Sequence, residues 1–162
     1  MSTSLFITLC VICSYGQNKE TNPQDVIDQF IWCIQNSSTN DEIISRFIGK
    51  DNSFFLNDSV KQIVDYRLDY LKNSLEGKEI NIYKYTDRPE EFYQYKDEEK
   101  LLKFFIVEVN GKTTEIGAER IYVISTKATR DGGTFILLDD AEKKIASFLP
   151  FWIGDSVSMI KL

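Results

Sequence analysis

The sequence predicts an α+β domain in which about three N-terminal helices pack on a curved antiparallel sheet of about 4–6 strands, with a cone-like outline. Up to residue 77, apolar side chains recur at helical spacing between capping and stop residues. From Ile80 onward the period changes to two, and β-branched and aromatic residues dominate. Tight-turn sequences separate the later segments, and strands joined by tight turns are antiparallel.

The first two helices are predicted from their ends. Asn22-Pro23 supplies a cap followed by proline at the first helical position. The next helix opens at Thr39 with Glu42 three residues later, which is the capping-box pattern, and Gly49 closes it. The stripe predicted to be buried on the first helix comprises Val26, Ile27, Phe30, Ile31 and Ile34.

A third helix is predicted from Asn57 or Asp58 to Gly77. Arg67 lies at the border of its apolar face. The arginine stem can pack while the head reaches water or a carboxylate such as Asp65 or Asp69; alternatively, the head points into a cavity and holds an anion. The face predicted to be buried comprises Val60, Ile63, Val64, Leu68, Leu71 and Leu75.

Turn sequences divide the remainder into strands. Asn110-Gly111 and residues 130–133 are strong hairpin signals, and residues 87–90 and 140–142 also read as turns. Several strands are apolar on both faces, which predicts that one face packs on the helices and the other is covered by a neighbour or a dimer mate. The predicted strands are residues 80–86, 92–96, 101–109, 119–129, 134–140 and 144–152.

The N-terminus resembles an export leader. Residues 5–13 form an apolar run too short to span a bilayer, which needs about 20 residues. Ser14 and Gly16 are the small residues that a signal peptidase reads, so we predict a signal peptide over 1–16 and a single domain over 17–162, with its core at about 22–152. A lipid anchor on Cys13 and a buried N-terminal strand are the alternatives. The expected location is the periplasm or the extracellular space.

The composition excludes several chemistries. The chain has no histidine, so histidine-activated nucleophiles and histidine-based zinc sites are ruled out. With 25 acidic and 19 basic residues and no phosphate-binding loop, nucleic acid is not an expected partner. The acidic runs fall at turns, and we assign no catalytic residue, metal or cofactor. After loss of the leader only Cys33 remains, which reads as a buried apolar residue because no basic residue is near it in sequence.

Two aromatic groups are candidates for binding. If residues 80–96 form a hairpin, Tyr83, Tyr85, Tyr93 and Tyr95 make one patch that could stack on a flat ligand or contact a protein. Cross-strand aromatic pairing that only stabilises the sheet is the simpler interpretation. Residues 151–153 form an apolar cluster that plugs the core or contacts a dimer mate.

The element order resembles the nuclear transport factor 2-like superfamily, which includes ketosteroid isomerase. The stretches concerned are DVIDQFIWCIQ, SVKQIVDYRLDYL, FFIVEVNGK, RIYVISTK and GTFILLDDAEKKIASFLPFW. The leader ending in SYGQ and the final strand pair also resemble small exported proteins of Bacteroidota-type bacteria. The superfamily resemblance implies a curled sheet around a helix-covered pocket, in which enzymes place an Asp and a Tyr. No family motif transfers to individual residues here.

Three functions follow as hypotheses. The leading one is an exported, non-catalytic domain that binds a small apolar ligand or a protein partner, with a homodimer left open. The second is a histidine-free isomerase or hydratase that uses a pocket carboxylate as base and a tyrosine as hydrogen-bond donor. The third is an envelope protein-interaction module that uses the tyrosine patch and the acidic surface.

Overall fold

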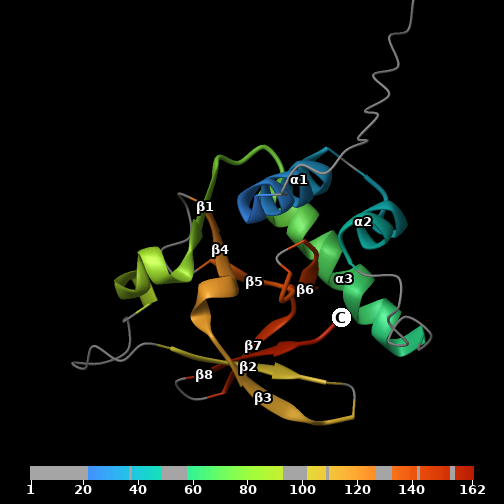
Figure 1. Ribbon diagram of the computed structural model, residues 1–162. Helices are drawn as coiled ribbons and strands as arrows, with labels where there is room; N and C mark the ends of the chain where they lie inside the picture. Colours follow the sequence, from blue (N-terminus) through green and yellow to red (C-terminus); the bar gives the residue numbers. More distant parts are fainter. Residues whose placement is uncertain are drawn as a thin grey trace, which may run out of the picture.

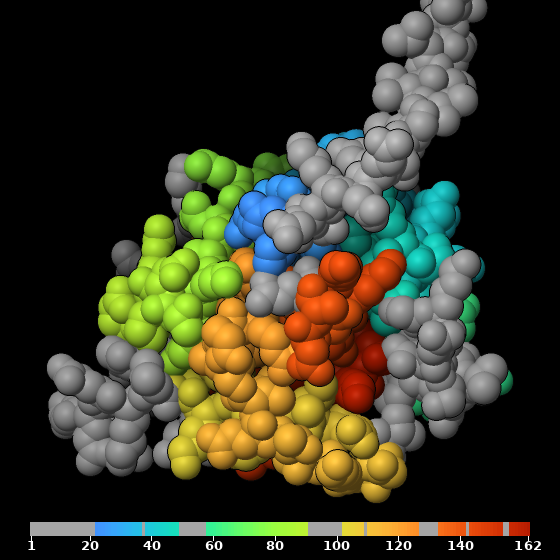
Figure 2. All heavy atoms as spheres, viewed as in Figure 1, coloured from blue at the N-terminus to red at the C-terminus, as the bar shows by residue number. Residues whose placement is uncertain are grey.

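The computed structural model is a three-layer α+β structure, in which helices cover one face of a sheet and a second sheet covers its other face (Figure 1). In the space-filling view, α1 and α2 lie toward one end of the molecule and strands β2 and β3 toward the other (Figure 2). The residues that the structure describes are 22–36, 38–48, 58–92, 102–108, 110–126, 133–141, 143–153 and 156–162.

The three predicted helices are confirmed as α1 (Pro23–Gln35), α2 (Asn40–Phe47) and α3 (Asp58–Leu75). Asn22 caps α1 by accepting a hydrogen bond from the backbone N–H of Gln24 at 3.1 Å. The predicted stripe of α1 is buried. None of the described helices has the length and hydropathy that crossing a bilayer requires.

Two four-stranded sheets replace the single sheet that the sequence predicted. The first, sheet A, has the order β1-β4-β5-β6, and the second, sheet B, has the order β3-β2-β8-β7. Sheet A consists of β1 (Ile80–Lys84), β4 (Ile121–Thr126), β5 (Thr134–Leu138) and β6 (Ile145–Ser147). Sheet B consists of β2 (Lys103–Val107), β3 (Thr113–Ile116), β7 (Pro150–Ile153) and β8 (Ser156–Ile160).

Sheet A is buried on both faces, which explains why its strands carry apolar residues at both odd and even positions. On β4, Tyr122 and Ile124 join a core cluster with the helices, whereas Ile121 and Val123 join a second cluster with sheet B. The second face is therefore covered by sheet B of the same chain. The core also includes residues beyond position 152, since Val157, Met159 and Leu162 are buried.

The expectation of a purely antiparallel sheet is wrong at one pair, because β2 and β8 are parallel. The segment 144–152, expected as one strand, is divided between β6 in sheet A and β7 in sheet B. Pro150 has no N–H to donate to a ladder, and the N–H of Leu149 turns to the Ser147 hydroxyl at 3.2 Å, so the chain leaves sheet A here.

Both strong hairpin signals correspond to paired strands. Around Asn110-Gly111, β2 and β3 are antiparallel, and Gly111 has a φ of +83°, which favours glycine. β4 and β5 are likewise antiparallel, although residues 127–132 lie outside the described residues. Gly133 is required there, since a Cβ atom at this position would lie 2.1 Å from the Ile124 carbonyl oxygen.

The prediction of a hairpin over residues 80–96 is wrong for residues 80–92, the part of it that the structure describes. Strand β1 pairs antiparallel with β4, so that Tyr83 lies opposite Val123. After Lys84 the chain forms short 3₁₀ turns at Tyr85–Asp87 and Pro89–Phe92. The proline at position 89 fixes φ and provides no ladder donor, which favours a turn over a continued strand.

Candidate functional site

The described half of the predicted tyrosine patch lies in the core. Tyr83 and Tyr85 are buried in the cluster between the two sheets. The Tyr85 hydroxyl accepts a hydrogen bond from the Leu102 N–H at 2.9 Å, and its ring meets Phe104 edge-on at 4.8 Å. Tyr93 and Tyr95 lie outside the described residues. The two described tyrosines therefore pack between the two sheets, and they do not pair across a local hairpin.

Arg67 lies at the edge of the helical layer, between α3 and the start of β5. Its Nη2 donates to the Thr134 hydroxyl at 3.2 Å, and its guanidinium carbon lies 5.0 Å from the centroid of the Tyr70 ring. The Nε atom is buried and has no hydrogen-bond partner among the residues that the structure describes. Desolvation lowers the pKa of Arg67 from its ordinary value, and the nearby Tyr70 acts in the opposite direction.

The carboxylates suggested as partners of Arg67 are engaged elsewhere. Asp65 lies 3.8 Å from Lys61 Nζ, and Asp69 accepts from Asn40 Nδ2 at 3.1 Å. Among the described residues no carboxylate pairs with Arg67. This guanidinium is therefore half-buried with a hydroxyl and an aromatic ring as neighbours, which leaves it able to take up an anionic group.

A row of large side chains is exposed on α3 beside Arg67. Ile63, Tyr66 and Tyr70, spaced i, i+3 and i+7, are 51%, 74% and 49% exposed. This spacing places them on one face of the helix. We call Ile63, Tyr66, Arg67 and Tyr70 the α3 aromatic surface.

Sequence reasoning missed the α3 aromatic surface because it assigned Ile63 to the buried face. On the predicted face, Val60 packs against the core, and the buried residues are Val64, Leu68, Leu71 and Leu75. Ile63, Tyr66 and Tyr70 repeat the same helical period with an offset of about one residue. That second period was the available signal, but only the packing of α3 decides which of the two rows is covered.

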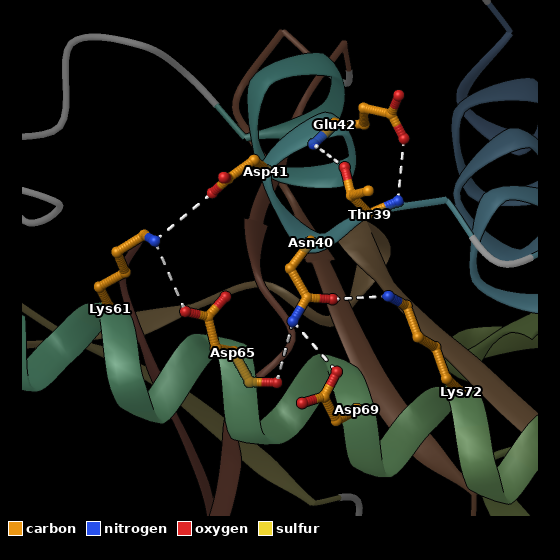
Figure 3. A network of polar contacts seen from close by, with 8 residues as sticks. All are labelled: Thr39, Asn40, Asp41, Glu42, Lys61, Asp65, Asp69 and Lys72. Atoms are coloured by element: carbon orange, nitrogen blue, oxygen red, sulfur yellow. Dashed lines mark hydrogen bonds and ion pairs between the residues drawn. The ribbon is translucent and has the colours of Figure 1, made fainter.

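A third face of α3 is occupied by a polar network with α2 (Figure 3). The side-chain Oδ1 of Asn40 accepts from Lys72 Nζ at 2.7 Å, while its Nδ2 donates to the Asp69 carboxylate. Lys61 Nζ lies 3.5 Å from Asp41 and also contacts Asp65. The network fixes α2 across α3, so one face of α3 lies in the core, a second lies on α2, and the aromatic surface is exposed.

The N-terminus of α2 is held by the predicted capping box, which is confirmed. The Thr39 hydroxyl accepts from the Glu42 N–H at 3.2 Å, and the Glu42 carboxylate accepts from the Thr39 N–H at 2.9 Å (Figure 3). Both contacts satisfy backbone donors that a helix start leaves unpaired. The role of these two hydrogen bonds is structural, because both partners belong to the first turn of α2 and its cap.

A hollow between the C-terminal ends of α1 and α3 has a volume of about 210 Å³. Its lining is Ile34, Gln35, Lys72, Asn73 and Glu76. Gln35 Nε2 donates to the carbonyl oxygens of Leu75 and Lys78, both at 3.1 Å, and so closes the end of α3. This polar, open hollow lacks the enclosed apolar character of a small-molecule pocket.

The catalytic hypothesis requires a buried carboxylate. Among the described residues the buried polar side chains are Thr126, Ser147 and Ser158, and no Asp or Glu side chain is buried. The same part of the chain contains no group of three or more potential metal ligands.

Cys33 is buried on α1, as predicted, but its surroundings differ from the expectation. Arg46 of α2 places Nη1 3.7 Å from the Cys33 sulfur and donates through Nη2 to Gln29 at 2.8 Å. A basic residue is therefore close in space although none is close in sequence. The contact links α1 to α2 in the packing of the helical layer.

Comparisons of this chain with protein-family models, with curated proteins and with solved structures gave no match.

Proposed function

We propose that this protein is a non-catalytic interaction domain and that the α3 aromatic surface is its binding site for a protein partner. The observation that carries the proposal is the exposed row of Ile63, Tyr66 and Tyr70 beside the half-buried Arg67. The other two faces of α3 are used within the domain, one by the core and one by α2.

The composition of this surface fits protein recognition. Tyrosine and arginine are enriched among the residues that dominate binding energy at interfaces. Arg67 is already partly desolvated and is held by Thr134 and Tyr70, so binding would order it little further. The partner that fits is a protein surface that carries an apolar group for Ile63 and the tyrosines and a carboxylate for Arg67.

Site-specific photocrosslinking in the native host tests this proposal. A benzophenone amino acid in place of Tyr66 is expected to yield a discrete adduct that mass spectrometry identifies. The control places the same group at Glu115, which is exposed on β3 in the other sheet. Adducts of equal yield at both positions, or none at Tyr66 with the protein present at normal level, would overturn the proposal.

A second arm tests the role of Arg67. With the crosslinker at Tyr66, Arg67→Met is expected to lower the adduct yield at least about fivefold, which corresponds to about 1 kcal/mol of binding energy. An unchanged yield would remove Arg67 from the binding surface. Lys61→Met is the matched control, because Lys61 lies on the face of α3 turned to α2.

Export remains part of the proposed function and rests on the leader-like residues 1–16. Intact-mass analysis of the protein from its native host is expected to show a chain that begins at Gln17. A chain that retains residues 5–13 would contradict this expectation.

The relation to the nuclear transport factor 2-like superfamily also remains a proposal. Three N-terminal helices on one face of a largely antiparallel sheet support it. A co-crystal structure with a small apolar ligand bound between the helices and sheet A would strengthen it, and failure of such ligands to bind there would count against it.

A further inference from the structure

Strand β7 is an open edge of the molecule with an unusual composition. The strand order places it at one end of sheet B. Phe151, Trp152 and Ile153 are all exposed, and the strand carries no charged residue. Edge strands of monomeric proteins are usually protected by charges, bulges or coverage, because an apolar edge pairs readily with another strand.

The other described edges have such protection. β3 carries Glu115, and β1 ends in Lys84, whose Nζ lies 5.6 Å from the Tyr122 ring centroid. β6 is only three residues long, and its Ala146 carbonyl accepts from the Leu162 N–H at 2.9 Å. Among the described strands, β7 is thus the edge on which large apolar side chains are exposed without a charge.

The register of β7 with β8 determines which backbone groups point outward. Pro150 lies opposite Met159, and the Ile160 N–H donates to the Leu149 carbonyl at 3.3 Å. In an antiparallel ladder the residues that bond to the neighbour alternate, so Phe151 bonds to β8 and Trp152 directs its N–H and C=O away from β8. Pro150 also faces outward, which is where a residue without an N–H is tolerated.

We propose that β7 pairs antiparallel with β7 of a second copy of this chain. Centred on Trp152, the pairing lets each Trp152 donate its N–H to the other's carbonyl. Phe151 then lies opposite Ile153 of the second copy as a non-hydrogen-bonded pair, with side chains in close contact. The two copies of sheet B, with four strands each, thereby form a single eight-stranded sheet across the two-fold axis.

A second copy fits this edge because the pairing is self-complementary. The chain has a formal net charge of −6, so two copies repel each other in general. They meet with least repulsion where no charge is present, and β7 is such a surface. Because only residues 151–153 of each β7 strand pair in this register, the contact is small, and a dissociation constant of about 1–100 µM is expected.

Analytical ultracentrifugation from about 1 µM to 1 mM protein measures the dissociation constant of the dimer for the original protein and for variants with charges introduced on β7. Phe151→Lys and Ile153→Glu, each alone, place one charge against an apolar residue of the second copy and are expected to raise the dissociation constant at least about tenfold. The double variant sets each introduced ammonium against an introduced carboxylate, and is expected to restore dimerisation to within about threefold of the original protein.

The two tryptophans provide a second readout, because their exposure is similar. Trp32 on α1 is 60% exposed and Trp152 is 56% exposed. In a Trp32→Phe variant, Trp152 reports alone, and its emission is expected to shift to the blue and resist acrylamide quenching as concentration rises. In the matched Trp152→Phe variant, Trp32 is expected to show neither change.

Each outcome is decisive. A monomer throughout the concentration range overturns the proposal, as does a dimer that neither single charge weakens. Single variants that weaken the dimer without recovery in the double variant refute the Trp152-centred register. Tyr66→Ala, on the α3 aromatic surface, is expected to leave the dimer unchanged, so that failure of the dimer and failure of the proposed function are distinguishable. Far-UV circular dichroism of every variant identifies any loss of fold.

Discussion

Thr134→Val tests whether Arg67 and Thr134 act as a unit. Valine keeps the shape of threonine but removes the hydroxyl that accepts from Arg67 Nη2 at 3.2 Å. A hydrogen bond to a charged group contributes about 1.5–3 kcal/mol, and partial exposure of Arg67 places this one at the lower end. We therefore expect the free energy of unfolding to fall by about 1–2 kcal/mol.

Arg67→Met is the second single variant of a double-mutant cycle with Thr134→Val. Methionine loses the same hydrogen bond and the contact of the guanidinium with Tyr70, which contributes about 0.5–1 kcal/mol at exposed sites. It also removes the buried Nε, which has no partner in the described part of the chain; such an unpaired group costs about 1–3 kcal/mol. The opposing terms nearly cancel, so the expected change in stability is within about 1 kcal/mol.

The coupling between Arg67 and Thr134 is measured by urea unfolding of four proteins: the original, the two single variants and the double variant. Unfolding is followed by circular dichroism at neutral pH. In the Arg67→Met background, Thr134→Val is expected to cost less than about 0.5 kcal/mol, which gives a coupling energy of about 0.5–2 kcal/mol. The slope against urea should be the same for all four. If Thr134→Val is as costly without Arg67 as with it, the reasoning about this pair is refuted.

Three further changes, with Tyr66→Ala as a surface control, test the fold by the same unfolding assay. Thr39→Ala removes the capping-box hydroxyl of α2 and is expected to cost about 1 kcal/mol, whereas no loss would show that α2 does not depend on its cap. Tyr85→Phe leaves the Leu102 N–H without this acceptor and is expected to cost about 1–3 kcal/mol; a neutral result would mean that another acceptor replaces it. Phe30→Ala empties a buried position between Phe47 and Phe148 and is expected to cost about 3–5 kcal/mol, while Tyr66→Ala on the surface should cost under about 0.5 kcal/mol; similar losses would contradict the assigned burial.

Local signals predicted local structure well. The caps at Asn22 and Thr39 depend on side chains within three residues, and the Asn110-Gly111 turn depends on the φ that glycine permits. The apolar stripe of α1 also identified its buried face. These interactions are complete within a short stretch of chain, so the sequence of that stretch is sufficient to recognise them.

The pairing of distant strands was not predictable in this way. Antiparallel neighbours follow from tight turns, but β2 and β8 pair in parallel across about fifty residues. The sequence of neither strand indicates that the other is its partner. The same limit applies to Tyr83, whose partner is Val123 of β4 and not a tyrosine of a local hairpin.

The candidate site was predicted only in part. Arg67 was singled out because it borders an apolar helical face, yet its partners Thr134 and Tyr70 were not foreseen. Thr134 is distant in sequence, and Tyr70 carried no signal beyond its helical spacing. The exposed row on α3 was missed because Ile63 fits two helical faces equally well by period alone.

By itself, the sequence determined the helices, the hairpin turns and the absence of histidine chemistry, since each depends on residue type and short-range spacing. Tertiary structure decided that the strands divide into two sheets, that the second sheet covers the first, and which apolar residues remain on the surface. The physical reason is that burial is a property of packing between elements: an apolar period states that a face can be covered, and only the assembled layers determine which face is.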